Sequence, residues 1–229
     1  MLLSDLKLIL LSTFTLKRLI YPQNIYENLI DQIVEKGYAV GDAFLKEETL
    51  SALFNQLLQL RKNDAMKAAG IGQLIEREVI QSIRGDQIHW LTKKSTHAFE
   101  QLFNRQIEAF SAYLNRSCFL SLNDYEFHYT CYPPGTFYKK HIDRFQSDRS
   151  RILSLILYLN KDWKKGDGGE IVVYPNNAEA QIIEPRWGRV VCFKSDELEH
   201  EVLPTQVDRY SITGWLKSVN SENIIQLID

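Results

Sequence analysis

The sequence predicts an α+β fold, mainly β, in which N-terminal helices buttress a rolled double sheet of the jelly-roll kind. Two observations carry this prediction. Before residue 120, apolar side chains recur at helical spacing, whereas after Asn123 short β-rich runs follow one another with turn residues between them. The chain has 229 residues, of which 45% are hydrophobic, and shows no internal repeat or linker, so we expect one domain over residues 1–229.

Helices are expected in the first half, where they form a buttress over residues 22–120. The first helix has Pro22 at its start and Gly37 just after its end, which is the usual punctuation of a helix. The other two carry stripes of leucine and phenylalanine, which are typical of a core-facing helix side. The three segments span residues 22–36, 50–58 and 96–116.

Three connecting segments have weaker patterns. Residues 1–20 form an N-terminal extension whose short apolar run is atypical of a signal peptide, so we expect a helix or a loosely attached segment. Residues 38–45 are β-like. Residues 61–82 are charged and contain two glycines, and we expect a mobile connection there.

Eight short strands are expected in the β-rich half, which gives a core over residues 125–217. Each strand is rich in β-branched and aromatic residues and is bounded by the turn sequences PPG, KKGDGG, PNN or PRWG. The expected strands are 125–132, 137–142, 151–159, 170–174, 181–183, 189–193, 200–203 and 209–217.

Charge and cysteine usage limit the function classes. The net charge of −2 lacks the basic excess of proteins dedicated to nucleic acids or membrane surfaces, so we expect neither partner. A protein, peptide or small molecule fits better. Cys118, Cys131 and Cys192 are widely spaced and odd in number, which indicates buried free thiols in a reducing cytoplasm.

A His-x-Asp motif, His141 and Asp143, lies at the end of the second expected strand. Alternate residues of a strand share a face, so the imidazole and the carboxylate converge. With five His and 29 acidic residues, roughly 0.6 such motifs arise by chance, so the motif needs support from its surroundings. His200, which begins the seventh strand, would complete the two-His-one-carboxylate triad of non-haem Fe(II) oxygenases.

An arginine and a tyrosine accompany this triad. Arg209 opens the last strand within an apolar sequence, where an unpaired guanidinium would be costly. It therefore requires an anion, and its planar fork can donate two hydrogen bonds to a carboxylate. Tyr158, central in the apolar strand LSLILYLN, could add a phenolic donor to the same carboxylate.

Several stretches together resemble a known family. They are HYTCYPPGTFYKKHID, LILYLNKDW, GGEIVVYP, IEPRWGRVVCF and HEVLPTQVDRYSITGW, and upstream SIRGDQIHW and KGYAVGDAFL. In this order they resemble the prolyl hydroxylases that act on the hypoxia-inducible factor and their bacterial relatives. The resemblance covers roughly residues 25 to 217 and implies a double-stranded β-helix. The segment RFQSDRS and the short tail after Lys217 differ from the animal enzymes, so the substrate is not identified.

The resemblance assigns roles to individual residues. It implies that His141, Asp143 and His200 bind the iron, and that Arg209 and Tyr158 hold the distal carboxylate of 2-oxoglutarate. The matching pocket residues are Tyr132, Tyr138, Thr213 and Trp215, where Tyr138 faces the substrate and the other three the cosubstrate or the metal.

The stretch IRGDQIHW matches a family element that folds over the bound polypeptide. It lies outside the expected β-helix core, and its composition suits a loop that closes on a substrate. Arg84, Asp86 and Trp90 are therefore the candidate substrate-binding residues. The remaining histidines, His89, His97 and His128, lack partners at ligand spacing, and we interpret them as structural or exposed.

The leading functional hypothesis is a peptidyl-prolyl 4-hydroxylase. The resemblance implies Fe(II) as cofactor, 2-oxoglutarate and O₂ as cosubstrates, ascorbate as reductant, and a proline-containing protein or peptide as substrate. We expect a monomer. The reaction would convert 2-oxoglutarate to succinate and CO₂ while it hydroxylates an unactivated C–H bond.

Other functions stay open. The nearest is an oxygenase of the same superfamily that acts on another protein residue or on a small molecule. A nucleic-acid demethylase is disfavoured because YSITGW lacks the further arginine of that branch, and a halogenase is disfavoured because Asp143 occupies the position that a halide needs. A non-catalytic jelly-roll binding module would have no use for Arg209 beside the metal cavity.

Overall fold

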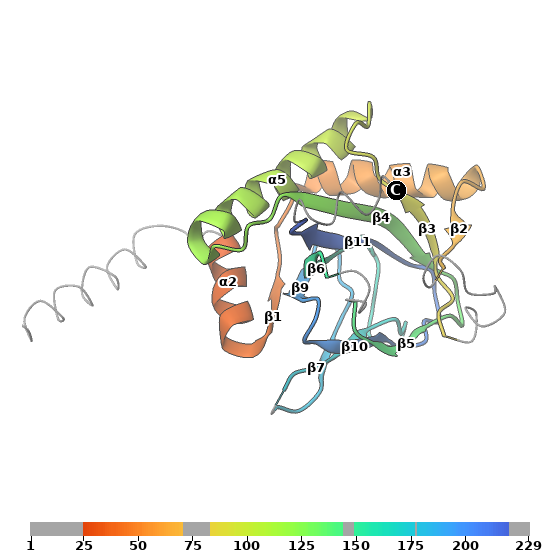
Figure 1. The fold of residues 1–229 in the computed structure, drawn as a ribbon. Helices are drawn as coiled ribbons and strands as arrows, with labels where there is room; N and C mark the ends of the chain where they lie inside the picture. Colours follow the sequence, from red (N-terminus) through yellow and green to blue (C-terminus); the bar gives the residue numbers. More distant parts are fainter. Residues whose placement is uncertain (1–24, 71–82, 144–148, 177, 220–229) are drawn as a thin grey trace, which may run out of the picture.

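Two antiparallel β-sheets lie face to face beside a layer of helices in the computed structural model of the chain (Figure 1). The structure describes residues 25–70, 83–143, 149–176 and 178–219. The expected N-terminal extension lies outside the described residues, as does most of the connection that we expected to be mobile.

The larger sheet has seven strands among the described residues, in the order β1-β9-β6-β11-β4-β3-β2, and every neighbouring pair is antiparallel. Its centre is the long strand β11, which pairs with β4 on one side and β6 on the other. The strands are β1 Tyr38–Gly41, β2 Lys67–Ala68, β3 Gln87–Trp90, β4 Asp124–Tyr132, β6 Arg151–Tyr158, β9 Val190–Lys194 and β11 Arg209–Lys217.

The smaller sheet has four strands within the described ranges, in the order β5-β10-β7-β8. From β4 to β11 the chain passes repeatedly from one sheet to the other, and only β7 and β8 follow each other within the same sheet. Such crossing is the double-stranded β-helix that the resemblance implied, and this expectation is confirmed. The strands are β5 Tyr138–His141, β7 Ile171–Tyr174, β8 Gln181–Ile183 and β10 Glu199–Val202.

Strand β6 shows how the sequence separates the two faces of the larger sheet. Leu153, Leu155 and Leu157 belong to the core between this sheet and the helices. The intervening Ile156 and Tyr158 belong to a second core between the two sheets. The period of two in a strand sends alternate side chains to opposite faces, so one apolar strand serves both cores.

In the described part of the chain, three helices cover the outer face of the larger sheet (Figure 1). They are α2 Ile25–Lys36, α3 Glu47–Lys62 and α5 Ala98–Cys118. On α5 the buried residues Phe103, Ile107, Phe110 and Leu114 recur every three or four positions, which places them on one side. This helical layer leaves the inner face of the sheet free to build a site.

The sequence predicted most of these elements. Each of the eight expected strands is present with ends within two residues, and the three helices are present, although α3 is longer than expected and residues 22–24 are outside the described range. The prediction for IRGDQIHW was partly wrong. Its last four residues form β3, a strand of the larger sheet that pairs with β4, and only Ile83 to Asp86 precede it as a connection.

Two of the three cysteines agree with the expectation of buried free thiols. Cys131 and Cys192 are buried free thiols, whereas Cys118 is only partly buried, contrary to our expectation.

Within the described ranges, every helix is too short or too polar to cross a lipid bilayer.

Candidate active site

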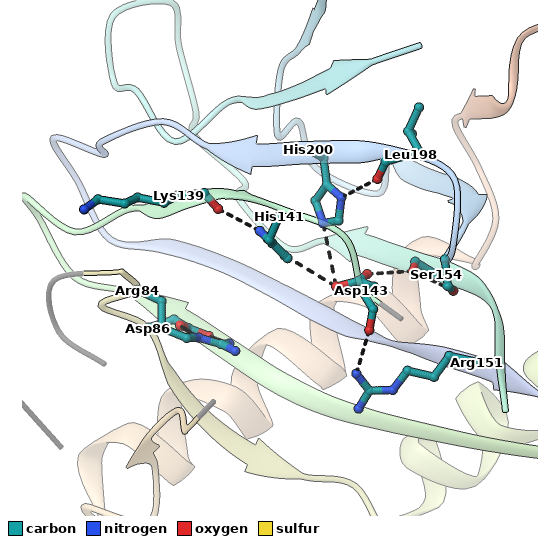
Figure 2. Close-up of polar contacts among 10 residues, drawn as sticks. Arg84, Asp86, Lys139, His141, Asp143, Arg151, Ser154, Leu198 and His200 are labelled. Carbon is teal, nitrogen blue, oxygen red and sulfur yellow. Dashed lines mark hydrogen bonds and ion pairs between the residues drawn. The ribbon is translucent and has the colours of Figure 1, made fainter. Parts of the chain in front are cut away.

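The expected triad is assembled where β5, an edge strand of the smaller sheet, pairs with β10 (Figure 2). His200 on β10 lies directly opposite His141, the last residue of β5, and Asp143 follows two residues later. Asp143 Oδ1 is 3.4 Å from His141 Nε2 and 3.8 Å from His200 Nε2. One ligand atom from each of the three side chains lies within 4.8 Å of the others.

Backbone carbonyls orient both imidazoles. His141 Nδ1 donates to the carbonyl of Lys139 at 2.7 Å, and His200 Nδ1 donates to that of Leu198 at 3.1 Å (Figure 2). Because a carbonyl only accepts, the proton of each neutral ring lies on Nδ1 and the lone pair on Nε2. Both Nε2 atoms face the carboxylate, as metal-binding imidazoles oriented by a partner at the other nitrogen do.

Hydrogen bonds also fix the Asp143 carboxylate. Ser154 Oγ donates to Asp143 Oδ2 at 2.6 Å, and it accepts from Ser195 Oγ at 2.9 Å because its own proton is already used. Both serines are fully buried. We did not predict this contact from the sequence. The signal was present, because Ser154 is the polar residue on the inward face of the apolar strand β6.

The electrostatics keep Asp143 and His200 in the protonation states that bind a metal. Burial alone would raise the pKa of Asp143, but His200, His141 and the Ser154 hydrogen bond outweigh it, and this pKa lies well below its ordinary value. Burial lowers the pKa of His200 to about 4, although Asp143 acts in the opposite direction. At neutral pH the site therefore offers a carboxylate and a neutral imidazole.

A cavity of about 820 Å³ adjoins the triad between the two sheets. Arg209 lines it and is almost fully buried, with its Nε donating to the Gly169 carbonyl at 2.8 Å. Arg209 Nη2 and the Tyr158 hydroxyl are both buried and make no hydrogen bond to any described residue. Two unsatisfied donors beside a cavity are a binding site for an anion such as a carboxylate.

The glycine turn before β7 holds Arg209 in this place. Gly169 has a φ of +74°, a left-handed conformation that glycine adopts without steric cost. A Cβ at this position would lie 3.0 Å from Arg209 Cδ and 3.2 Å from Thr205 Cβ. The arginine stem therefore passes directly over the glycine.

Three further residues that we assigned to the cosubstrate or metal line the same cavity, namely Tyr132, Thr213 and Trp215. The ring of Tyr132 lies against the Arg209 guanidinium, with 4.9 Å between ring centroid and Cζ. Thr213 Oγ1 lies 3.1 Å from Ser211 Oγ. Trp215 Nε1 is buried without a partner in the described part of the chain, so it too can donate to a bound molecule.

The candidate substrate residues lie around the cavity, but two of them pair with each other. Arg84 donates two hydrogen bonds to Asp86, at 2.6 and 2.5 Å, and the Asp86 carboxylate is fully buried (Figure 2). The guanidinium of Arg84 also lies over the ring of Tyr138, which stacks on His141 with 3.6 Å between centroids. Trp90 lines the cavity and is 50% exposed.

Comparisons with known proteins show the family of this chain. The family model described as the 2OG-Fe(II) oxygenase superfamily matches residues 127–217. A solved structure, described as a Pseudomonas putida prolyl-4-hydroxylase, is 30% identical with a TM-score of 0.78, and the match covers 86% of this chain and 100% of that chain. The chain belongs to the 2OG-Fe(II) oxygenase superfamily.

Other relatives agree with this oxygenase assignment. Egl nine homolog 1 from Mus musculus is 33% identical over 203 residues, which are 82% of this chain and 48% of that protein, so the chain spans about half the length of this relative. A prolyl hydroxylase from Trichoplax adhaerens, solved with a peptide fragment of the hypoxia inducible factor oxygen degradation domain, has a TM-score of 0.78 and 24% identity. The match covers 89% of this chain and 92% of that one, and shows the common fold.

The oxygenase cofactors fit the residues that are present. Two imidazoles and one carboxylate form the facial donor set that Fe(II) accepts, with open positions on the other side. The unsatisfied donors of Arg209 and Tyr158 fit a carboxylate group of 2-oxoglutarate. The sequence indicated both groups of residues, and the structure places the triad and Arg209 on one cavity, with the Tyr158 ring against Arg209.

Three acidic or basic residues of the cavity wall were not predicted to lie at the site. Glu126, Arg151 and His128 all line the cavity of this oxygenase. His128 is buried, and its Nδ1 lies 2.9 Å from Thr130 Oγ1, so it is structural as expected but not remote from the site. Charged residues in or beside strands are common on protein surfaces, so nothing in the sequence distinguished Glu126 and Arg151.

Proposed function

We propose that the protein is an Fe(II)- and 2-oxoglutarate-dependent dioxygenase that hydroxylates a prolyl residue of a protein or peptide. One observation carries the proposal: a single cavity is lined by His141, Asp143, His200 and Arg209. Arg209 Nη2 and the hydroxyl of the adjoining Tyr158 are buried there without a partner among the described residues. The relatives described as prolyl hydroxylases support the choice of substrate.

In this proposal the triad holds the iron through the Nε2 atoms of the two histidines and one carboxylate oxygen. Arg209 and Tyr158 hold the distal carboxylate of 2-oxoglutarate, and Tyr132, Thr213 and Trp215 line the space between. Fe(II), once bound with 2-oxoglutarate and O₂, supplies the oxidising power that places one oxygen atom on an unactivated C–H bond and the other in succinate. The chain's own residues supply position and exclude water from the cavity.

The charges of the cavity wall support an uncharged substrate residue. Arg84 is neutralised by Asp86 within the wall. Arg151 is neutralised in the same way by Glu126, at 2.9 Å. With Arg209 occupied by 2-oxoglutarate, a charged side chain that entered this space would lose its hydration without finding an unpaired counter-ion in Arg84 or Arg151, which disfavours it.

Aromatic rings in the wall support an apolar, ring-shaped residue. Trp90, Tyr138 and Trp215 all line the cavity. Flat aromatic faces pack well against the rigid ring of proline and require no hydrogen bond from it.

We further propose that the enzyme acts as a monomer in the cytoplasm, uses ascorbate as reductant, and takes neither nucleic acid nor membrane as a partner.

The first test of the proposal is turnover of 2-oxoglutarate by the purified protein. Succinate should form only when Fe(II) and O₂ are both present, and His141→Ala or His200→Ala should abolish it. His89→Ala is the matched control, because His89 bonds to the Ala65 carbonyl and does not line the cavity. Unchanged turnover in both triad variants would contradict the oxygenase centre, and a protein without any turnover would favour a binding module.

The second test identifies the substrate. We would incubate the wild-type protein with Fe(II), 2-oxoglutarate and a host-cell lysate, with the His200→Ala protein as control, and search peptides for the added mass of one oxygen atom. Hydroxyproline that appears only with the wild-type protein is the expected result. The same mass gain on another residue, or none on peptides, would instead favour the related oxygenases that act on other residues or on small molecules.

A further inference from the structure

Asp143 differs from the other two triad residues because its backbone is not held in a strand. β5 ends at His141, and Asp143 lies beyond it. The Asp143 carbonyl accepts a hydrogen bond from Arg151 Nη1 at 3.1 Å (Figure 2). Arg151, the first residue of β6, thus fixes the main chain of the ligand, while Ser154 on the same strand fixes its carboxylate.

Arg151 is itself held from a second side. Its Nε and Nη2 both donate to Glu126 Oε1, at 3.1 and 2.9 Å, and Glu126 Oε2 accepts from Lys217 Nζ at 3.3 Å. Glu126 lies on β4 and Lys217 on β11, so the three side chains connect three adjacent strands. The Trp215 ring covers the guanidinium, with 3.4 Å from Cζ to the ring centroid.

We propose that Glu126 and Arg151 form a positioning pair that sets the place of Asp143 and thereby the metal affinity of the site. This inference rests on the proposed metal centre. The guanidinium uses one edge for Glu126 and the remaining Nη1 for the Asp143 carbonyl. Lysine keeps the charge but lacks this planar arrangement of donors, so it cannot make both contacts in the same geometry.

The physical reason is the freedom of the ligand before the metal binds. Without Arg151, Asp143 keeps its Ser154 hydrogen bond, but its main chain loses the contact that anchors it beyond the end of β5. A ligand that samples more positions must lose more conformational entropy when it binds. Without Glu126, Arg151 loses the partner that directs its guanidinium to the Asp143 carbonyl.

The test is a titration of the metal-free full chain with Co(II), followed by the d–d absorption of the bound ion, which requires neither turnover nor a known substrate. Arg151→Gln should weaken Co(II) binding by about tenfold or more, as loss of groups that orient metal ligands usually does. Arg151→Lys should behave like Arg151→Gln, and Glu126→Gln should fall between these variants and the wild type. The absorption bands should also change shape, because a displaced carboxylate alters the geometry around the ion.

The matched control is Arg186→Gln, which breaks a surface ion pair with Glu184. Its Co(II) affinity and spectrum should equal those of the wild type, and thermal unfolding of the metal-free proteins identifies any variant that loses its fold. If Arg151→Gln does not fold, Glu126→Gln decides the question alone. In the folded double variant the two losses should not add, because both act through the same contact.

Two outcomes would overturn the inference, and they are distinguishable. A wild-type protein that binds Co(II), with Arg151→Gln and Glu126→Gln variants of the same affinity and spectrum, would contradict the positioning role and leave the proposed function intact. A wild-type protein that binds no Co(II) would contradict the metal centre itself.

Discussion

The guanidinium carbon of Arg209 lies 4.9 Å from the ring centroid of Tyr158, and each side chain ends in a buried donor that no described residue satisfies. The two residues come from adjacent antiparallel strands, β11 and β6. Arg209 Nε is already used by Gly169, and its Nη1 lies 3.5 Å from Ser211 Oγ. The free donors for a carboxylate are therefore Nη2 and the Tyr158 hydroxyl, and only one of them belongs to the guanidinium.

This arrangement predicts the effect of Arg209→Lys. The variant keeps the charge but loses the planar donors, and a hydrogen bond to a charged group contributes about 1.5–3 kcal/mol. The apparent affinity for 2-oxoglutarate should fall roughly tenfold or more, measured as the cosubstrate dependence of succinate formation. Tyr158→Phe should reduce it less. A variant that unfolds while its cosubstrate titration is unaltered would mean that Arg209 has only a structural role.

The pairing of Arg84 with Asp86 predicts that the two single variants are worse than the double. Arg84→Ala would leave the fully buried Asp86 carboxylate unpaired, which costs about 3–5 kcal/mol of unfolding free energy. Arg84→Ala with Asp86→Ala removes both charges and should lose less. Urea unfolding of the three variants measures this, and equal losses in the single and double variants would contradict the buried pair.

The same double variant tests the proposed role in substrate binding. It should keep metal binding and the slow succinate formation without substrate, because neither residue contacts the triad directly. It should suppress hydroxylation of the protein target, because Arg84 covers Tyr138 at the cavity wall. Equal losses of both activities would mean that the pair supports only the fold, and no loss of either would remove it from substrate binding.

His128 predicts a pH dependence of stability. Burial lowers its pKa to about 4, from an ordinary value of 6.5, so the folded protein keeps a neutral imidazole where the unfolded chain is protonated. The free energy of unfolding that this pKa difference contributes is fully present above pH about 6.5. It is lost as the pH falls toward 4, and the loss is up to about 3 kcal/mol. His200 acts in the same direction in the metal-free protein.

The measurement is unfolding of metal-free wild type and His128→Gln over this pH range. The variant should lose less stability than the wild type as the pH falls, because one of the two buried histidines is gone, while glutamine can still bond to Thr130. Identical pH profiles for the two proteins would show that His128 binds protons equally in the folded and unfolded states.

The local patterns of the sequence determined the fold class and most elements. The alternation in β6 and the helical stripe of α5 each identify a face that must be buried, whatever the neighbours are. β3 escaped this reasoning because Gln87–Trp90 is short and half polar, and it forms a strand only because the edge of β4 is available. A strand that depends on its partner leaves little pattern of its own.

The residues of the candidate site can likewise be separated into those that the sequence indicated and those that only the tertiary structure placed. Residue chemistry and spacing pointed to His141, Asp143, His200 and Arg209, because the first two lie two positions apart at the end of an expected strand and a buried arginine requires an anion. Only the tertiary structure placed His200 opposite His141, because that contact depends on the register of β10 against β5, which no local pattern specifies.

Tertiary structure alone also decided which charges serve the site. Glu126 and Arg151 are 25 positions apart and become partners because β11 aligns β4 with β6. Arg84 and Asp86 are two positions apart, yet the sequence left open whether they face the substrate or each other. Pairing of charges depends on burial and on distances across strands, and these exist only once the sheets have formed.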